Sequence, residues 1–190
     1  MKTNIWQKIS HDNVLNVVED TIGQKLTNLF LPRNSYINRV FELELADSKK
    51  RIVVKFYRPA RWTRSMIQTE HDLLSKLAIE ELAVIQPLNF KGQTLFEFEG
   101  IFFAVFPKKG GRIMDELDKD QWQQIGRLIG RTHAISSKLE HPDRIVWRPQ
   151  KATSKHLEVL GDLKVIPQDY QEVFFNTAKS FISNYDSLFN

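Results

Sequence analysis

The strongest strand signal in this 190-residue chain is Arg51-Ile52-Val53-Val54-Lys55-Phe56-Tyr57, which is followed by Arg58-Pro59. Period-2 alternation places Lys55 on the same face as Val53 and Tyr57. A lysine in a strand is usually its solvated member, but large apolar residues flank this one, and Glu70 follows in the next predicted helix. An ion pair between Lys55 and Glu70 would aim the ammonium group at the phosphates of a nucleotide.

The residues around this strand predict an antiparallel sheet. In Arg39–Leu45, Phe41, Leu43 and Leu45 alternate with glutamates, and Asp47-Ser48-Lys49-Lys50 is polar turn material before the next strand, so the two strands form a hairpin. The other predicted elements are a helix over His11–Gly23 capped by Asp12 or Asn13, a helix over Arg64–Ala78 capped by Thr63, and strands over Thr94–Phe98 and Ile101–Phe106 joined at Glu99-Gly100. Such an order gives an α+β lobe.

The chain becomes helical after Gly110-Gly111. The sequence predicts a helix over Asp120–Leu139 with Asp118 or Asp120 as its cap, then a proline-containing loop, then a helix from Pro167 to about Leu188. We therefore expect a first lobe over residues 1–106, a hinge over 107–112 and a partial helical lobe over 113–190.

Composition excludes several classes of protein. The chain has no cysteine, a net charge of +4 and 42% hydrophobic residues, so it is a globular protein without disulfides or thiolate metal sites. It has no apolar run of roughly 20 residues and its histidines lack metal-ligand spacing, so we expect a cytoplasmic protein with no membrane or metal site. Its one basic aromatic segment, Tyr57–Arg64, is too short to predict a nucleic-acid partner.

Two loops are candidates for nucleotide contacts. Asn34-Ser35-Tyr36 precedes a strand, and small polar residues there can donate to phosphate oxygens, although the loop lacks glycine and could be a plain polar turn. Phe103-Ala104-Val105-Phe106-Pro107 runs into a loop where adenine could bind to backbone atoms. Because proline has no N–H, the Phe106 carbonyl and the Lys108 N–H would be the available pair; the alternative is a buried core strand followed by a turn.

Taken together and in this order, these segments resemble the aminoglycoside/choline-kinase-like phosphotransferases, and among them the bacterial stress-response kinases. The residues that carry the resemblance are Asn34–Val40, Val53–Trp62, Gly92–Leu95, Phe103–Pro107, Gly110-Gly111-Arg112 and Ile125–His133. The resemblance implies a protein-kinase-like N-lobe with ATP and Mg²⁺ as cofactors. It places Asn34 and Ser35 at the ATP phosphates, Lys55 as the phosphate-binding lysine with Glu70 as its partner, and Phe106 and Lys108 at adenine.

The resemblance leaves the phosphate acceptor open. It implies transfer to Ser or Thr of a protein substrate, or, as in other relatives, to a small alcohol such as an aminoglycoside, choline or homoserine. The family's H-G-D-x-x-x-x-N loop and later D-x-D motif, which supply the catalytic Asp and the metal ligands, are not found in these 190 residues.

We therefore expect a fragment of a kinase that is inactive alone, with the Mg²⁺ ligands lying beyond residue 190. The non-enzymatic alternative is a pseudokinase module that binds a nucleotide or a partner. Val173, Phe174, Phe175, Phe181 and Ile182 predict an exposed apolar face on the last helix, and therefore self-association or poor solubility.

Overall fold

The computed structural model describes residues 5–111, 114–140 and 143–189. The chain forms two compact units, residues 1–143 and residues 144–190, which are described separately. Within the described residues, no helix combines the length and the apolar character needed to cross a membrane.

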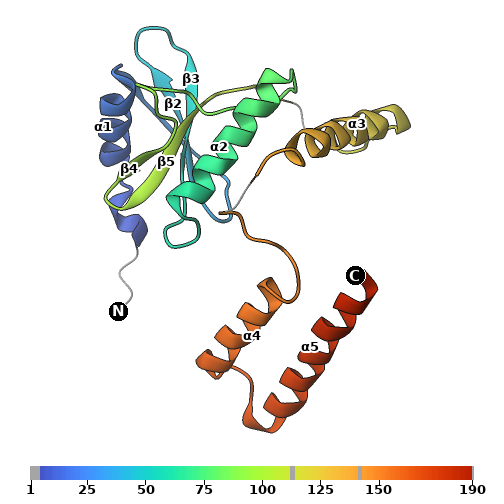
Figure 1. Cartoon of the computed structure of the whole chain (residues 1–190). Helices are drawn as coiled ribbons and strands as arrows, with labels where there is room; N and C mark the ends of the chain where they lie inside the picture. The colour runs from blue at the N-terminus through green and yellow to red at the C-terminus, as the bar shows by residue number, and fades with distance from the viewer. Residues whose placement is uncertain (1–4, 112–113, 141–142, 190) are drawn as a thin grey trace. The chain divides into compact units, whose positions relative to one another are not determined.

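The first unit is built on a five-stranded sheet with strand order β1-β2-β3-β5-β4 (Figure 1). The strands are β1 (Leu26–Arg33), β2 (Arg39–Leu45), β3 (Arg51–Phe56), β4 (Phe96–Phe98) and β5 (Ile101–Pro107). Every neighbouring pair is antiparallel, and Val54 at the centre of β3 lies opposite Phe41 of β2 and Val105 of β5. The predicted α+β class and the β2–β3 hairpin are confirmed.

Strand β1 was not predicted from the sequence. Its residues do not alternate in polarity, it contains Pro32, and its register shifts between Leu26 and Phe30. Proline cannot donate to a ladder and is confined to edge strands, bulges and strand ends. Because β1 forms one edge of the sheet, Pro32 is tolerated there.

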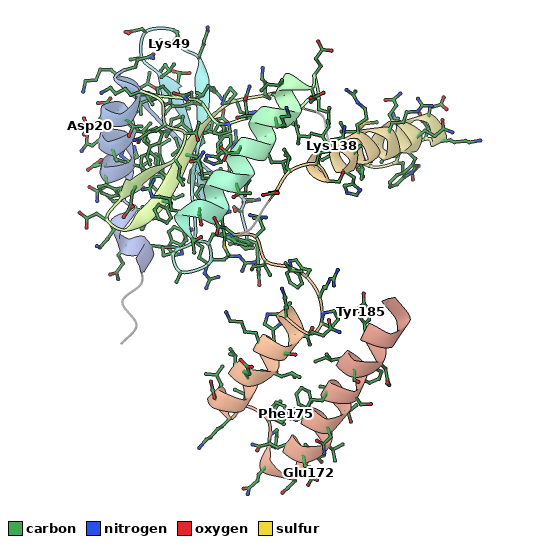
Figure 2. The ribbon with its side chains drawn as sticks, in the orientation of Figure 1. Asp20, Lys49, Lys138, Glu172, Phe175 and Tyr185 are labelled. Atoms are coloured by element: carbon green, nitrogen blue, oxygen red, sulfur yellow. The ribbon has the colours of Figure 1, made fainter. Side chains whose placement is uncertain are left out.

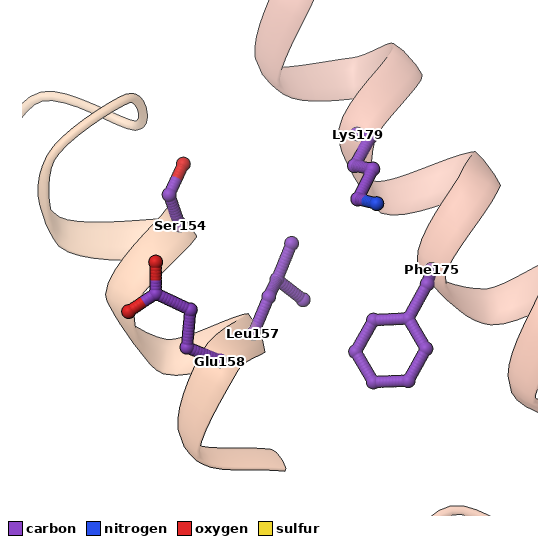
Figure 3. A pocket seen from close by; sticks show the side chains of 5 residues that line it. All are labelled: Ser154, Leu157, Glu158, Phe175 and Lys179. Carbon is purple, nitrogen blue, oxygen red and sulfur yellow. The ribbon is translucent and has the colours of Figure 1, made fainter. Parts of the chain in front are cut away.

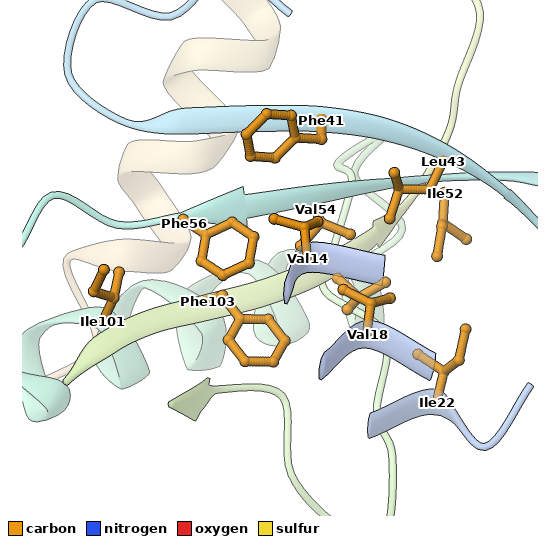
Figure 4. Close-up of a cluster of buried hydrophobic side chains, with 11 residues drawn as sticks. Val14, Val18, Ile22, Phe41, Leu43, Ile52, Val54, Phe56, Ile101 and Phe103 are labelled. Atoms are coloured by element: carbon orange, nitrogen blue, oxygen red, sulfur yellow. The ribbon is translucent and has the colours of Figure 1, made fainter. Parts of the chain in front are cut away.

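One face of the sheet is covered by α1 (His11–Ile22), which follows a short 3-10 helix, η1 (Ile5–Lys8). Val14, Val18 and Ile22 of α1 meet Phe41, Leu43, Ile52, Val54, Phe56, Ile101, Phe103 and Val105 of the sheet (Figure 4). Ser10 caps α1 by accepting a hydrogen bond from Asn13, so the predicted caps Asp12 and Asn13 were wrong by two or three residues. Gly23 ends the helix in the left-handed region, with φ of 67°.

The opposite face carries α2 (Arg64–Ile79), which Thr63 caps as predicted. Ile67 of α2 packs with Tyr57, Leu95 and Ala104 in a second buried cluster. Side chains fill the space between the sheet and each of the two helices (Figure 2). The alternation of β3 therefore divides its residues between two cores, and Lys55 lies on the α2 side.

Helix α3 (Lys119–Ser136) begins with a capping box in which Asp118 and Gln121 exchange hydrogen bonds. It contains no buried residue, although the Arg131 guanidinium donates to the Glu80 carbonyl at 3.1 Å. Arg112, part of the predicted hinge, lies outside the described residues. Helix α3 belongs to the same compact unit as the sheet, and the predicted boundary at residues 107–112 stays a prediction.

The second unit consists of α4 (Ala152–Leu163) and α5 (Gln168–Phe189). Helix α4 lies where the sequence predicted only a loop, and it ends at Lys164 in the left-handed region. On α5, Val173, Phe174 and Phe181 are exposed as expected, whereas Phe175 and Ile182 are half-buried. Phe175 lies close to Gly161 of α4, which explains part of this burial. Self-association through α5 stays a prediction.

Candidate functional site

A cavity of about 360 Å³ opens on the α2 side of the sheet in the first unit. Its lining residues come from β2, β3, α2, the loop after α2, the end of β5 and the two residues after β5: Val40, Val53, Lys55, Glu70, Leu74, Ile85, Phe106, Pro107, Lys108 and Lys109. Apolar walls with a few charged groups are typical of sites for small ligands and cofactors. Four of the predicted site residues, Lys55, Glu70, Phe106 and Lys108, meet at this cavity.

Lys55 and Glu70 form the predicted ion pair, with 3.2 Å between Nζ and Oε1. The side chains are 25% and 38% exposed, so the pair lies at the wall of the cavity and remains accessible to a ligand. The Lys55 ammonium also lies 4.3 Å from the centre of the Tyr57 ring. A cation held between a carboxylate and an aromatic face has a defined position from which it can meet an anionic group.

The loop with Asn34 and Ser35 does not line the cavity but connects β1 to β2 near Lys55. Val40 of β2 lies opposite Lys55, and the loop ends two residues before Val40. The loop is internally ordered, because the Asn38 N–H donates to Ser35 Oγ at 3.3 Å. It is also tied to the segment after β3, because the Arg58 N–H donates to Asn38 Oδ1 at 3.1 Å. Asn34 and Ser35 are exposed at the lysine end of the hairpin.

The structure corrects one feature of the predicted adenine-binding backbone. The Lys108 N–H donates to the Arg51 carbonyl at 3.2 Å and so extends the β3–β5 ladder by one residue. That N–H is therefore already engaged within the sheet. The sequence could not reveal this because the end of strand pairing depends on the register between segments about 50 residues apart.

A buried carboxylate lies on the same face of the sheet as the cavity. Glu42 is 1% exposed and lies opposite Val53, one of the lining residues. The Arg51 guanidinium donates to it at 2.8 Å and the Arg33 guanidinium donates to its other oxygen. Burial alone raises the pKa of Glu42, but the hydrogen bonds from Arg51 and Arg33 outweigh burial and hold the pKa below the usual glutamate value.

This cluster predicts a pH dependence of stability. A glutamate whose pKa is lower in the folded state stabilises the protein above its unfolded-state pKa of about 4.5, and this contribution is lost as the pH falls through the folded-state pKa. We expect Glu42→Gln to lower the melting temperature most at pH 6–7 and progressively less toward pH 3. Thermal unfolding across this range would measure the difference, with Glu116→Gln, an exposed carboxylate of the same unit, as control. A difference in melting temperature between Glu42→Gln and the wild type that does not change with pH would contradict this prediction.

Tyr57, His71 and Thr94 lie beside the cavity and are linked in a row by hydrogen bonds. The sequence did not indicate this polar string. The Tyr57 hydroxyl lies 3.0 Å from Nε2 of His71, and Nδ1 of His71 lies 2.9 Å from the hydroxyl of Thr94. Tyr57 and His71 are 2% and 1% exposed. The one available signal was a histidine directly after Glu70 on the side of α2 that faces the sheet.

The second unit has a cavity of its own. It holds about 350 Å³ between α4 and α5 and is lined by Ser154, Leu157, Glu158, Phe175 and Lys179 (Figure 3). Leu157 and Phe175 face one another across it (Figure 3). None of the predicted site residues lies in this unit, and we assign no function to its cavity.

Comparison with known proteins gives matches over most of the chain. The family described as "Phosphotransferase enzyme family" matches residues 30–173. Stress response kinase A of Escherichia coli K12 is 32% identical over 182 residues, which are 94% of this chain and 54% of that protein. Serine/threonine protein kinase RdoA of Salmonella typhimurium is 35% identical over 156 residues, 80% of this chain and 46% of that protein. The chain spans about half the length of the curated relatives it matches.

Solved structures show the same fold. An amicoumacin kinase in complex with AMP-PNP, Ca²⁺ and Ami has a TM-score of 0.72 at 17% identity, over 98% of this chain and 56% of that one. A microcompartment-associated aminopropanol kinase has a TM-score of 0.56 at 18% identity, over 72% of this chain and 46% of that one. At these identities, the likeness establishes a shared fold.

Proposed function

This chain belongs to the phosphotransferase enzyme family, and we propose that its first unit is the ATP-binding part of a protein serine/threonine kinase. The observation that carries the proposal is the Lys55–Glu70 ion pair at the wall of an apolar cavity. In kinases, a lysine on the corresponding strand binds the nucleotide phosphates and pairs with a glutamate of the following helix.

Four of the predicted residues, Lys55, Glu70, Asn34 and Ser35, each have a role at the phosphates. The Lys55 ammonium donates to α- and β-phosphate oxygens, and Glu70 holds it in place and preserves its charge. The loop with Asn34 and Ser35, anchored through Asn38 at the same end of the hairpin, offers donors to the phosphates. Val40 and Val53 supply the apolar surface on which the base would lie.

We infer that adenine meets the backbone of Pro107 and Lys109 in place of the Phe106–Lys108 pair. In an antiparallel ladder, hydrogen-bonded and non-hydrogen-bonded pairs alternate. Because Lys108 is hydrogen-bonded to Arg51, the next pair, Pro107 with Ile52, is not, and its carbonyls point away from the partner strand. The Val105 carbonyl, two residues earlier, points outward in the same way and accepts from the Leu88 N–H at 2.7 Å. The Pro107 carbonyl and the Lys109 N–H would thus be the pair offered to a base.

The acceptor we propose is a Ser or Thr hydroxyl of a protein. The support is the 35% identity to a relative named a serine/threonine protein kinase. A small alcohol is the second candidate, because solved neighbours are named as kinases of amicoumacin and aminopropanol. Their identities of 17% and 18% support the fold alone, so the sequence relatives weigh more in this choice.

The 190 residues contain no H-G-D-x-x-x-x-N motif, so we propose that they bind ATP without transferring its phosphate. In this fold, an aspartate of that motif accepts the proton of the substrate hydroxyl. The described residues also contain no group of three or more potential metal-ligating side chains. We therefore assign no step through Mg²⁺ to them.

Calorimetric titration of the 190-residue chain with ATP, ADP and adenosine tests this proposal. ATP and ADP should bind about tenfold or more tightly than adenosine, because a charged hydrogen bond to Lys55 is available only to the phosphates. Incubation with radiolabelled ATP and a mixture of proteins should give no labelled protein. Absence of any nucleotide binding, or equal affinity for ATP and adenosine, would reject the assignment of the cavity.

A further inference from the structure

The buried string of Tyr57, His71 and Thr94 joins the two elements that carry the candidate lysine and its glutamate. Tyr57 directly follows β3, two residues after Lys55, and His71 directly follows Glu70 in α2. The string therefore connects the same strand end to the same helix turn as the Lys55–Glu70 ion pair does. Thr94, at its far end, lies just before β4 and is half-buried.

The hydrogen bonds of the string satisfy every polar atom of the His71 ring. Burial lowers the pKa of His71, and burial together with the nearby Glu70 carboxylate raises the pKa of Tyr57, so both groups are neutral at neutral pH. A neutral imidazole has one N–H and one lone-pair nitrogen, and a hydroxyl can pair with either. Removing one hydroxyl would therefore leave a buried ring nitrogen unpaired, which is costly.

The ion pair alone does not account for the placement of α2. Both of its side chains are partly exposed, and exposed ion pairs contribute little to stability. Ile67 and Leu77 bury their side chains, but apolar burial is not directional and permits small rotations of the helix. The hydrogen bonds of His71 are directional and restrict that rotation.

The string also contacts two residues that line the cavity, Lys55 and Phe106. The Tyr57 ring, whose hydroxyl meets His71, lies under the Lys55 ammonium at 4.3 Å. The His71 ring meets the ring of Phe106, a lining residue, edge to face at 6.3 Å. A shift of His71 would thus reach the Lys55 ammonium through Tyr57.

We propose that Tyr57, His71 and Thr94 are positioning residues that set the rotation of α2, and thereby hold Glu70 against Lys55 and the Lys55 ammonium at the nucleotide phosphates. This inference rests on the proposed ATP site. It assigns none of the three residues direct contact with the nucleotide.

Two variants test it in the 190-residue chain. Tyr57→Phe removes the hydroxyl and keeps the ring under Lys55, and it should weaken ATP binding about tenfold while adenosine affinity stays unchanged. Thr94→Val removes the far end of the string without touching Lys55 or the cavity lining, and it should weaken ATP binding about threefold, again without effect on adenosine. Tyr170→Phe, the same deletion at a 67% exposed tyrosine, is the matched control.

A merely structural role predicts another pattern. In that case, the variants would lower the melting temperature but leave the ratio of ATP to adenosine affinity at its wild-type value, and the proposal would be overturned. A crystal structure of Tyr57→Phe without nucleotide measures the Lys55–Glu70 separation directly. The Lys55–Glu70 separation should open beyond about 4 Å, the limit of an ion pair, and an unchanged pair would also overturn the proposal. Failure of the wild-type chain to bind ATP rejects the proposed function, and the crystal structure still decides the positioning role.

Discussion

Replacing Lys55 by alanine is expected to weaken ATP binding by roughly 10- to 100-fold, because a charged hydrogen bond to phosphate is lost from a partly desolvated site. Adenosine affinity should stay within about twofold of wild type, since Lys55 is assigned to the phosphates alone. The fold should survive, because the Lys55 side chain is 25% exposed and its pair with Glu70 is accessible to solvent. Calorimetric titration with ATP and with adenosine measures both quantities.

Two further variants sharpen this result. Lys50→Ala removes the same charge from an exposed turn of the β2–β3 hairpin and should leave ATP affinity unchanged. Lys55→Arg keeps the charge but changes the shape of the donor, and should recover only part of the affinity. ATP affinity that is unaffected by Lys55→Ala would remove the lysine from the site. A parallel loss of adenosine binding would indicate that the substitution disturbs the cavity itself.

Replacing Phe103 by alanine is expected to destabilise the first unit by about 3–5 kcal/mol, the usual cost of deleting a buried phenyl ring. Phe103 is fully buried at the centre of the core between the sheet and α1 (Figure 4). Its ring lies 5.1 Å from that of Phe56 and 5.6 Å from that of Phe96. Neighbouring rings of this size cannot fill the space that the deletion leaves.

Denaturant unfolding followed by circular dichroism would measure this loss. Phe181→Ala deletes the same ring at a position that is 72% exposed and should change the free energy of unfolding by less than about 0.5 kcal/mol. A loss of less than about 1 kcal/mol in Phe103→Ala would contradict the position of this core. The expected loss of about 3–5 kcal/mol is a large share of the free energy of unfolding of a typical domain.

Several parts of the fold follow from local sequence. Alternation in Arg39–Leu45 correctly separates Phe41, Leu43 and Leu45 from the glutamates, because side chains in a strand point to opposite faces in turn. Thr63 and Asp118 are found as caps because their side chains bond to backbone three residues away. Strand β1 was missed because a bulge and a proline interrupt its strand pattern. Helix α4 was missed because it follows a stretch without clear periodicity.

The candidate site divides in the same way. Local sequence predicted the face of β3 on which Lys55 lies and the presence of Glu70 in the next helix. The ion pair between Lys55 and Glu70 agrees with that prediction. Local sequence did not predict three other features: the burial of Glu42, the string through His71 and the hydrogen bond of the Lys108 N–H. Each depends on a partner that lies 9 to 57 residues away in the sequence.

The sequence by itself determined which residues lie on the two faces of β2 and β3 and where α2 and α3 begin, because periodicity and capping depend on residues within one turn or one strand. Only the tertiary structure decided that Glu42 is buried between two arginines, that His71 bonds to Tyr57 and Thr94, and that the ladder extends to Lys108. The reason is physical: strand register and helix rotation result from packing of the whole core, and polar groups find their partners only after that packing is in place.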